Sequence, residues 1–156
     1  MKTLILYATK HGAAQEIARR IADAVKDAVI HNINQGEIPD LADFDCVIVG
    51  SSIYVGMIRK EAKAFIACHA DVLRNKTLGL FLSGMDLSKE NEAFAANFPP
   101  EILKAAKAKG FLGGIFDPQK AGMMERFIMK AAAKQSGYTD AIDHNKIKEF
   151  VEELKK

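Results

Sequence analysis

The start of the chain limits its possible folds more than any other segment. Residues 4–7 form an apolar run of strand length, residues 8–12 form a short polar loop with one glycine, and a helical pattern follows at once. In that pattern Ile17, Ile21 and Val25 recur at a spacing of four, which is typical of one face of a helix. The segment therefore predicts a strand, a loop and a helix whose N-terminal amides can hold a phosphate group.

The residues of this loop narrow down the kind of phosphate site. A dinucleotide-binding loop requires three glycines at fixed spacing, and a nucleotide-triphosphate loop requires Gly-Lys followed by Ser or Thr. The loop has neither pattern, but it offers the hydroxyl of Thr9 and two side chains that can be cationic, Lys10 and His11. The residues that we expect around the phosphate are Thr9, Lys10, His11, Gly12, Ala13 and Ala14.

Further along the chain, apolar runs of strand length alternate with helical patterns, which favours a parallel sheet with helices on both faces. We expect strands at residues 3–7, 29–33, 46–50, 78–82 and 111–116. We expect helices after Gly12, around residues 62–73, over residues 90–98, 100–109 and 123–135, and after Asp143, which is suited to cap the final helix. Gly110 is expected to end a helix, and Gly113 with Gly114 to mark a bulge or the close approach of another backbone.

The first strand, loop and helix resemble those of the flavodoxin family. That family combines an aromatic residue at the end of the strand, a hydroxyl and a small residue in the loop, and a small and an aliphatic residue on the inner helix face. The residues on this pattern are Tyr7, Thr9, Gly12, Ala18 and Ile21. One position differs, because the family usually has threonine where this chain has Ala14. The resemblance implies a flavodoxin-like α/β fold, a three-layer doubly wound five-stranded parallel sheet in the order 2-1-3-4-5, with FMN as cofactor.

In such a sheet the ligand lies at the carboxyl ends of the strands, so the loops after the third and fourth strands are further candidates. A planar ring needs backbone amides for its heteroatoms and apolar surface for its faces. By resemblance to flavodoxins, these loops border the isoalloxazine ring. The implied contacts are Ser51, Ser52, Ile53, Tyr54, Val55 and Gly56 in one loop, and Ser83, Gly84, Met85 and Asp86 in the other. Many flavodoxins stack an aromatic residue from the second loop, where this chain offers the looser cover of Met85.

A narrower resemblance links the chain to the menaquinone-dependent protoporphyrinogen oxidases of the flavodoxin superfamily. It rests on residues 1–6, residues 50–53 with Gly56, and residues 125–130 followed by Ser-Gly. Residues 86–109 are not similar, and those enzymes carry a longer basic and aromatic segment where this chain has residues 117–122. The resemblance implies a flavin-dependent oxidoreductase of the porphyrinogen or quinone-linked type, as an alternative to an electron carrier.

Composition and charge limit the partners. The chain has 156 residues, of which 49% are hydrophobic and 27% charged, as expected of one globular domain over residues 1–156. No apolar segment approaches the roughly 18 to 20 residues that span a bilayer, and no signal-peptide pattern is present, so we expect a cytoplasmic protein. The net charge of +2 argues mildly against an acidic carrier that is steered onto basic partners. Around the crevice we expect a basic rim of Lys10, His11, Arg59 and Lys60.

The remaining reactive residue types suggest no second site. Cys46 and Cys68 are expected to be buried, inert thiols, and the scattered histidines predict no metal site. Residues 123–129 are rich in Met and Phe, but the spacing of 124, 127, 128 and 131 indicates core packing rather than a membrane-binding helix face.

Three hypotheses of function follow. The first is an FMN redox protein in which the flavin carries the chemistry and the partner is a redox protein or a small organic or quinone substrate. For it we expect no nucleic acid, no integral membrane segment and no obligatory catalytic side chain, while peripheral membrane contact stays open. The second, a phosphorylatable receiver domain, requires an acidic pair after the first strand, where this chain has Thr9 and Lys10. The third, a flavodoxin-fold binding module without a ligand, is kept open by Ala14 and by the lack of a stacking aromatic residue.

Overall fold

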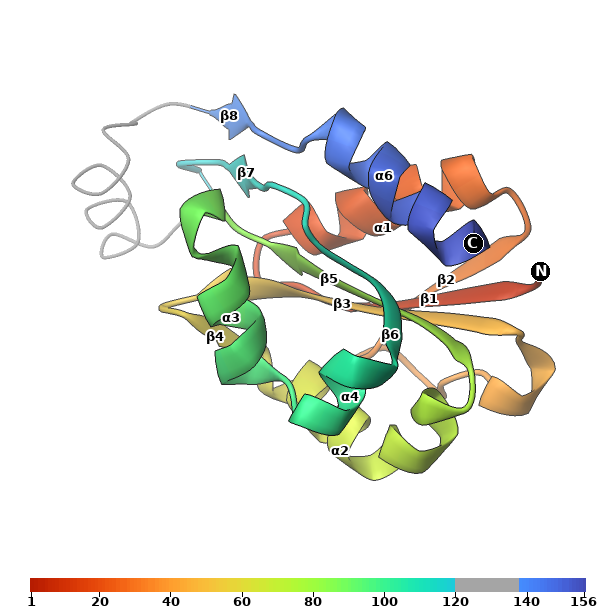
Figure 1. Ribbon diagram of the computed structural model, residues 1–156. Helices are drawn as coiled ribbons and strands as arrows, with labels where there is room; N and C mark the ends of the chain where they lie inside the picture. Colours follow the sequence, from red (N-terminus) through yellow and green to blue (C-terminus); the bar gives the residue numbers. More distant parts are fainter. Residues whose placement is uncertain (120–137) are drawn as a thin grey trace.

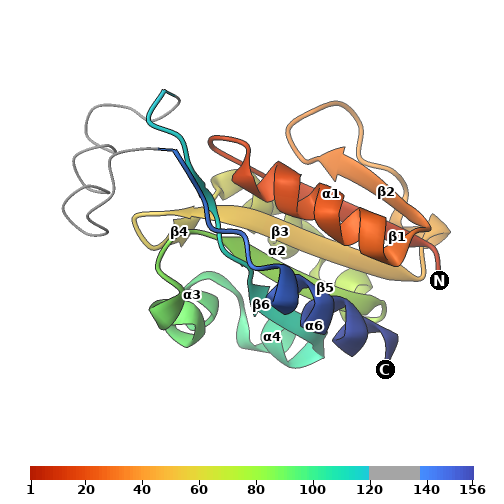
Figure 2. The same cartoon turned by 90° about the horizontal axis from the view of Figure 1, so that it is seen from above.

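The structure is a computed structural model that describes residues 1–119 and 138–156. Its central sheet lies between two layers of helices (Figure 1 and Figure 2). One face is covered by α1 (Ala13–Val25) and α6 (His144–Lys155). The other face is covered by α2 (Lys60–Arg74), α3 (Glu90–Asn97) and α4 (Pro100–Ala105). This arrangement confirms the predicted three-layer α/β fold.

The long strands of the sheet are all parallel. They are β1 (Thr3–Ala8), β2 (Ala28–Asn32), β3 (Cys46–Tyr54), β5 (Thr77–Ser83) and β6 (Ala106–Phe111). Their spatial order is β2-β1-β3-β5-β6, so the predicted order 2-1-3-4-5 is confirmed. In this order the chain reverses its direction of winding at β1 and β3, and a crevice is expected at the carboxyl ends of these two strands.

Short elements decorate the two ends of the sheet. Strand β4 (Met57–Ile58) returns antiparallel to the end of β3, and β7 (Ile115–Phe116) pairs with β8 (Thr139–Asp140) in a separate small sheet. Two single turns of 3₁₀ helix, η1 (Leu41–Asp43) and η2 (Leu87–Lys89), precede β3 and α3. Strands β4, β7 and β8 lie at the end of the sheet opposite the N-terminus (Figure 1).

Two apolar cores lie on the two faces of the sheet because side chains alternate along each strand. From β1, Leu4 and Leu6 pack into the core under α2, α3 and α4, whereas Ile5 and Tyr7 pack into the core under α1 and α6. All four side chains are buried. The continuous apolar run that predicted the first strand is therefore explained by burial on both faces.

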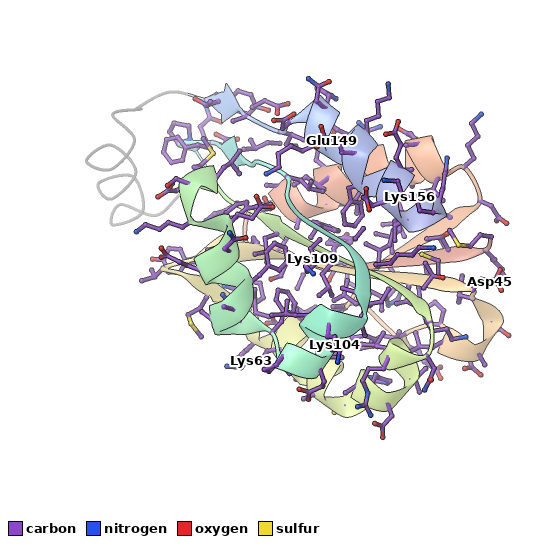
Figure 3. The ribbon with its side chains drawn as sticks, in the orientation of Figure 1. Asp45, Lys63, Lys104, Lys109, Glu149 and Lys156 are labelled. Carbon is purple, nitrogen blue, oxygen red and sulfur yellow. The ribbon has the colours of Figure 1, made fainter. Side chains whose placement is uncertain are left out.

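The fifth strand begins five residues earlier in the chain than predicted. Residues 104–109 contain only Lys and Ala, which favour helix in isolation, and the prediction therefore continued the helix to residue 109. In the structure α4 ends at Ala105 and β6 follows, with Lys107 and Lys109 exposed and Ala108 buried, as a period of two requires. Figure 3 shows Lys109 on this strand. Pairing with β5 overrides the local helix preference, so Gly110 lies within a strand and does not end a helix.

The last helix is formed as predicted. The Asp143 carboxylate accepts hydrogen bonds from the backbone N–H groups of Asn145 and Lys146, at 3.0 and 3.1 Å. This cap satisfies two of the amides that a helix start leaves without partners. The inner face of this helix, Ile147, Phe150, Val151 and Leu154, is buried.

Two predictions concern residues outside the described part of the chain: the helix over residues 123–135 with its apolar stripe, and the similarity over residues 125–130 and the Ser-Gly that follows them. Within the described part, no helix is both long enough and apolar enough to cross a membrane. The prediction of two buried thiols is half wrong, since Cys46 is buried in β3 but Cys68 is exposed on α2. Cys68 lies outside the buried face of the helix that Ala62, Phe65 and Ile66 form.

Candidate functional site

A cavity of about 260 Å³ opens at the carboxyl ends of the parallel strands. It lies between the loop after β1, the end of β3, the loop after β5, and β7. Eleven residues of the predicted site line it: Thr9, Lys10, His11, Ala13, Ser52, Ile53, Tyr54, Val55, Ser83, Gly84 and Met85. The fold therefore brings together three loops that are far apart in the sequence, as the strand order predicted.

The first wall of the cavity is the loop that leads into α1. Gly12 has a φ of 99°, a left-handed conformation that glycine adopts without strain, and helix α1 begins directly after it. The N–H of Gly12 donates to Oγ1 of Thr9 at 2.8 Å, which closes the loop. No side chain of the described residues caps α1, so the positive end of the helix dipole is left for an anion beside Ala13.

A hydrogen bond joins the first wall to the second, which is formed by the end of β3 and the hairpin that follows it. The backbone N–H of Lys10 donates to Oγ of Ser52 at 3.1 Å. The side chain of Lys10 runs toward the end of β3, and its Nζ lies 3.4 Å from the centre of the Tyr54 ring. Both residues line the cavity, so a cation–π contact connects the α1 loop to the end of β3.

The second wall is a tight hairpin between β3 and β4. Its two turn residues, Val55 and Gly56, have φ values of 51° and 75°, as in a turn that follows the twist of paired strands. A β-branched residue such as Val55 rarely adopts this conformation. The side chain of Val55 is 74% exposed at the edge of the cavity. The buried side chain of Asn97 on α3 holds the hairpin by bonding the carbonyl of Gly56 and the N–H of Ile58, both at 2.9 Å.

The third wall was predicted only in part. The chain after β6 runs beside the loop after β5, and the N–H of Gly84 donates to the carbonyl oxygen of Gly113 at 3.0 Å. A Cβ at Gly114 would lie 3.1 to 3.2 Å from the backbone of Gly84. The predicted close approach of another backbone at the glycine pair is therefore confirmed. It adds Gly114, Ile115, Phe116 and Asp117 to the cavity lining, all of which the sequence analysis missed.

The signal for these four residues was available. The fifth strand of a parallel sheet ends at the same edge as the first, third and fourth, so the segment after it belongs to the same set of loops. Phe116 also supplies an aromatic side chain to the cavity, which the loop at Met85 does not. The misplaced strand at residues 111–116 hid this segment, because it was read as part of the sheet.

Five predicted residues do not line this cavity. Ala14 is fully buried in the core under α1 and α6, and Gly56 lies in the hairpin turn. Ser51 is buried, and its Oγ accepts from the N–H of Arg59 at 2.9 Å. Asp86 accepts from the N–H of Ser88 and so caps η2. Gly12 lines an adjoining cavity instead.

The adjoining cavity has a volume of about 340 Å³, and most of the residues that line it have polar or charged side chains. Arg20 forms two ion pairs there, with its guanidinium 2.9 Å from the Glu16 carboxylate and 2.8 Å from the Asp140 carboxylate, and Arg19 pairs with Glu16 at 2.6 Å. The hydrogen bond from Arg20 lowers the pKa of the Asp140 carboxyl. His11 and Asp117 line both cavities. The charged groups beside the helix start are therefore largely paired with one another.

The predicted basic rim is smaller than expected. Lys10 and His11 line the main cavity, but Arg59 and Lys60 are not among the described residues that do. The Arg59 guanidinium lies 3.8 Å from the Glu61 carboxylate at the start of α2. Within residues 1–119 and 138–156, no group of three or more His, Cys, Asp or Glu side chains could hold a metal ion.

The strand order and the cavity beside the first helix define a flavodoxin-like α/β protein. Residues 4–143 match the sequence model of a family described as "Flavodoxin domain". The chain therefore belongs to the flavodoxin-domain family. The predicted family resemblance is confirmed.

The individual proteins to which the chain is similar share a quarter or less of its residues. The chain is 25% identical over 147 residues to protoporphyrinogen IX dehydrogenase [quinone] of Escherichia coli K12, with 88% of this chain and 81% of that protein covered. Its fold is similar to a Streptococcus pneumoniae flavodoxin, with a TM-score of 0.64, 18% identity, and 99% and 98% of the two chains covered. An FMN complex of a Lactobacillus acidophilus flavoprotein gives a TM-score of 0.50 at 17% identity, covering 72% of this chain and 90% of that one.

Proposed function

We propose that the chain binds FMN in the cavity at the carboxyl ends of β1, β3 and β5 and acts as a flavin redox protein. The observation that carries the proposal is the uncapped start of α1 at the edge of a cavity with mostly apolar walls. An anionic phosphate suits the first feature and a planar aromatic ring suits the second. FMN has both groups on one molecule.

The residues present fit the two ends of this ligand. At the phosphate end, the first turn of α1 after Gly12 would offer backbone amides and the helix dipole in place of the family's second hydroxyl. At the ring end, Tyr54 and Phe116 would supply aromatic surface, and Met85 would supply a polarisable sulfur. The two hydrogen-bonded loop contacts described above, at Ser52 and at Gly84, hold these walls in place before a ligand arrives.

The bound flavin would supply hydride and single-electron chemistry, and the protein would bind the cofactor and tune it. Flavin redox chemistry needs no side chain of the protein to act as acid, base or nucleophile. The chain's own part is to orient the ring, exclude water from one side of it through the apolar walls, and set the charge around it.

A titration of the purified protein tests the proposal. We expect FMN to bind and its fluorescence to change, whereas riboflavin, which lacks the phosphate, binds much more weakly. Thr9→Val removes the acceptor of the Gly12 N–H and should weaken FMN binding, because the loop loses its internal hydrogen bond of about 1 kcal/mol. Thr9→Ser keeps the hydroxyl and is the matched control. Equal affinity of the two variants would contradict the proposed role of the loop.

A second candidate is an oxidoreductase that passes hydrogen from an organic substrate through the flavin to a quinone. The name of the Escherichia coli relative favours it, and the exposed Val55 at the cavity edge offers apolar surface to a substrate. The test is to incubate the FMN-loaded protein with protoporphyrinogen IX and a soluble quinone and to follow porphyrin fluorescence. Fluorescence that rises faster than in controls without protein or quinone supports the enzyme. If the fluorescence does not rise faster with the protein than without it, the oxidoreductase is contradicted and the electron carrier is favoured.

A further inference from the structure

Lys10 extends from the proposed phosphate end of the cavity to the proposed ring end. Its backbone N–H is fixed by Oγ of Ser52 at 3.1 Å, while its Nζ lies 3.4 Å from the centre of the Tyr54 ring. An ammonium group on an aromatic face is attracted by the negative face of the ring and is partly removed from water. The side chain therefore holds a positive charge at the end of the cavity where a flavin ring would lie.

Few other charges line the cavity. Among the described residues, Lys10, His11 and Asp117 are its ionisable lining groups besides the Tyr54 hydroxyl. The Asp117 carboxylate accepts a hydrogen bond from the N–H of Gln119, at 3.0 Å, within its own turn. The rest of the lining is mainly apolar, and a charge acts more strongly beside apolar walls than in bulk water. The ammonium of Lys10 is thus the positive charge nearest the Tyr54 wall.

We propose that Lys10 raises the reduction potential of the bound flavin by stabilising the negative charge of the reduced ring. This inference rests on the proposed FMN site. Two electrons from an external donor such as dithionite, with one proton from solvent, convert the neutral oxidised ring into a reduced ring with one negative charge. No bond forms to the protein, and Lys10 keeps its proton. The ammonium therefore stabilises the product of reduction more than the reactant.

A thermodynamic cycle turns this into a measurement. The difference between the reduction potentials of bound and free flavin is proportional to the logarithm of a ratio. The ratio is the dissociation constant of oxidised FMN divided by that of reduced FMN. For a two-electron couple, each factor of ten in this ratio corresponds to 29.6 mV. A cation beside the reduced ring must also lower the pH at which that ring takes up its second proton.

The alternative is that Lys10 serves only the phosphate. In that case a bound ring would replace the ammonium on the Tyr54 face, and Lys10 would turn toward the phosphate dianion. The phosphate charge is the same in both redox states. Loss of Lys10 would then weaken the binding of oxidised and reduced FMN by the same factor and leave the reduction potential of the flavin unchanged.

The experiment compares Lys10→Met and Lys10→Gln, which remove the charge, with Lys10→Arg, which keeps it. Lys104→Met is the control, since Lys104 is exposed on α4 (Figure 3). Affinities for oxidised FMN and for dithionite-reduced FMN are measured without oxygen, and the potential is measured against a reference dye. The absorbance of the reduced complex is followed with pH.

We expect both neutral variants to lose at least about tenfold more affinity for reduced than for oxidised FMN, and their potential to fall by about 30 mV or more. The second protonation of the reduced ring should shift to higher pH in both. Lys10→Arg keeps the charge and should retain the preference for reduced FMN, even if both affinities change, and Lys104→Met should behave as the unchanged protein. If the neutral variants lose affinity equally for oxidised and reduced FMN, or lose none, the proposed role of Lys10 is overturned, but the FMN site is not. Failure of the unchanged protein to bind FMN overturns the proposed function itself, and the inference with it.

Discussion

The side-chain amide of Asn97 donates a hydrogen bond to the carbonyl oxygen of Gly56 at 2.9 Å, across 41 positions of sequence. Asn97 belongs to α3 and is buried, whereas Gly56 lies in the turn of the β3–β4 hairpin. The hairpin carries Tyr54 and Val55 at the wall of the cavity. The shape of this wall therefore depends on a residue that does not line the cavity itself.

Replacing Asn97 by alanine should loosen this wall. Asn97→Ala leaves the Gly56 carbonyl and the Ile58 N–H without their partner, and we expect a loss of about 1–3 kcal/mol in the free energy of unfolding. Urea denaturation measures the loss, and FMN titration should show weaker binding. Asn97→Asp keeps the acceptor for the Ile58 N–H. We expect its stability to lie between that of the unchanged protein and that of Asn97→Ala. An unchanged urea midpoint for Asn97→Ala would show that the hairpin does not need this side chain.

The glycine at position 113 should be essential for the third wall. A Cβ on Gly113 would lie 2.1 Å from the carbonyl oxygen of Ala141, and its φ is 92°. Gly36 has a similar positive φ of 68°, but a Cβ there meets nothing within 4 Å. Gly113→Ala should therefore lower stability by about 1–3 kcal/mol more than Gly36→Ala, since both share the backbone strain but only one adds a clash. Equal thermal midpoints of the two variants would contradict this packing.

The two thiols should differ sharply in reactivity. Burial raises the pKa of Cys46 to about 11, whereas Cys68 is exposed. Because the thiolate is the reactive form, we expect Ellman's reagent to modify Cys68 rapidly in the folded protein and Cys46 only after unfolding. Cys68→Ser should abolish the rapid phase, and Cys46→Ser should leave it intact. Rapid modification of the Cys68→Ser protein would mean that β3 is less protected than the structure indicates.

The ion pair between Arg20 and Asp140 should contribute stability that depends on pH. The hydrogen bond from Arg20 lowers the pKa of Asp140 in the folded protein, so the contribution is present above the unfolded pKa of about 4 and is lost as the pH falls through the folded value. The Asp140 side chain is 36% exposed, so we expect no more than about 1 kcal/mol. Thermal midpoints of the unchanged protein and of Asp140→Asn, measured from about pH 6 to about pH 3, should converge at the acid end. A constant difference between them would contradict the assignment.

Local patterns were enough to predict the elements that set the architecture. The apolar run through Leu4 and Leu6 and the helical spacing of Ile17 and Ile21 are read within a few residues of each other, and both are borne out. The same holds for Asp143, because a helix cap is a contact between neighbours in the sequence. The strand order then followed from the family resemblance, and with it the meeting of three predicted loops at one edge.

The features that were missed depend on contacts between distant residues. The start of β6 is decided by pairing with β5, which overrides the helix preference of its Lys and Ala residues. The approach of Gly114 to Gly84 brings Phe116 into the cavity, and the hold of Asn97 on the hairpin comes from another layer of the fold. No local pattern carries these contacts. The glycine pair indicated that a backbone would approach, but it could not indicate which one.

The central claim is that the α1 loop and the cavity beside it hold FMN. Isothermal titration calorimetry of the purified protein with FMN, and separately with riboflavin, tests this claim most directly. We expect saturable binding of one FMN per chain, with riboflavin binding much more weakly because it lacks the phosphate group that the start of α1 attracts. Absence of saturable heat with FMN, confirmed by equilibrium dialysis, would contradict it.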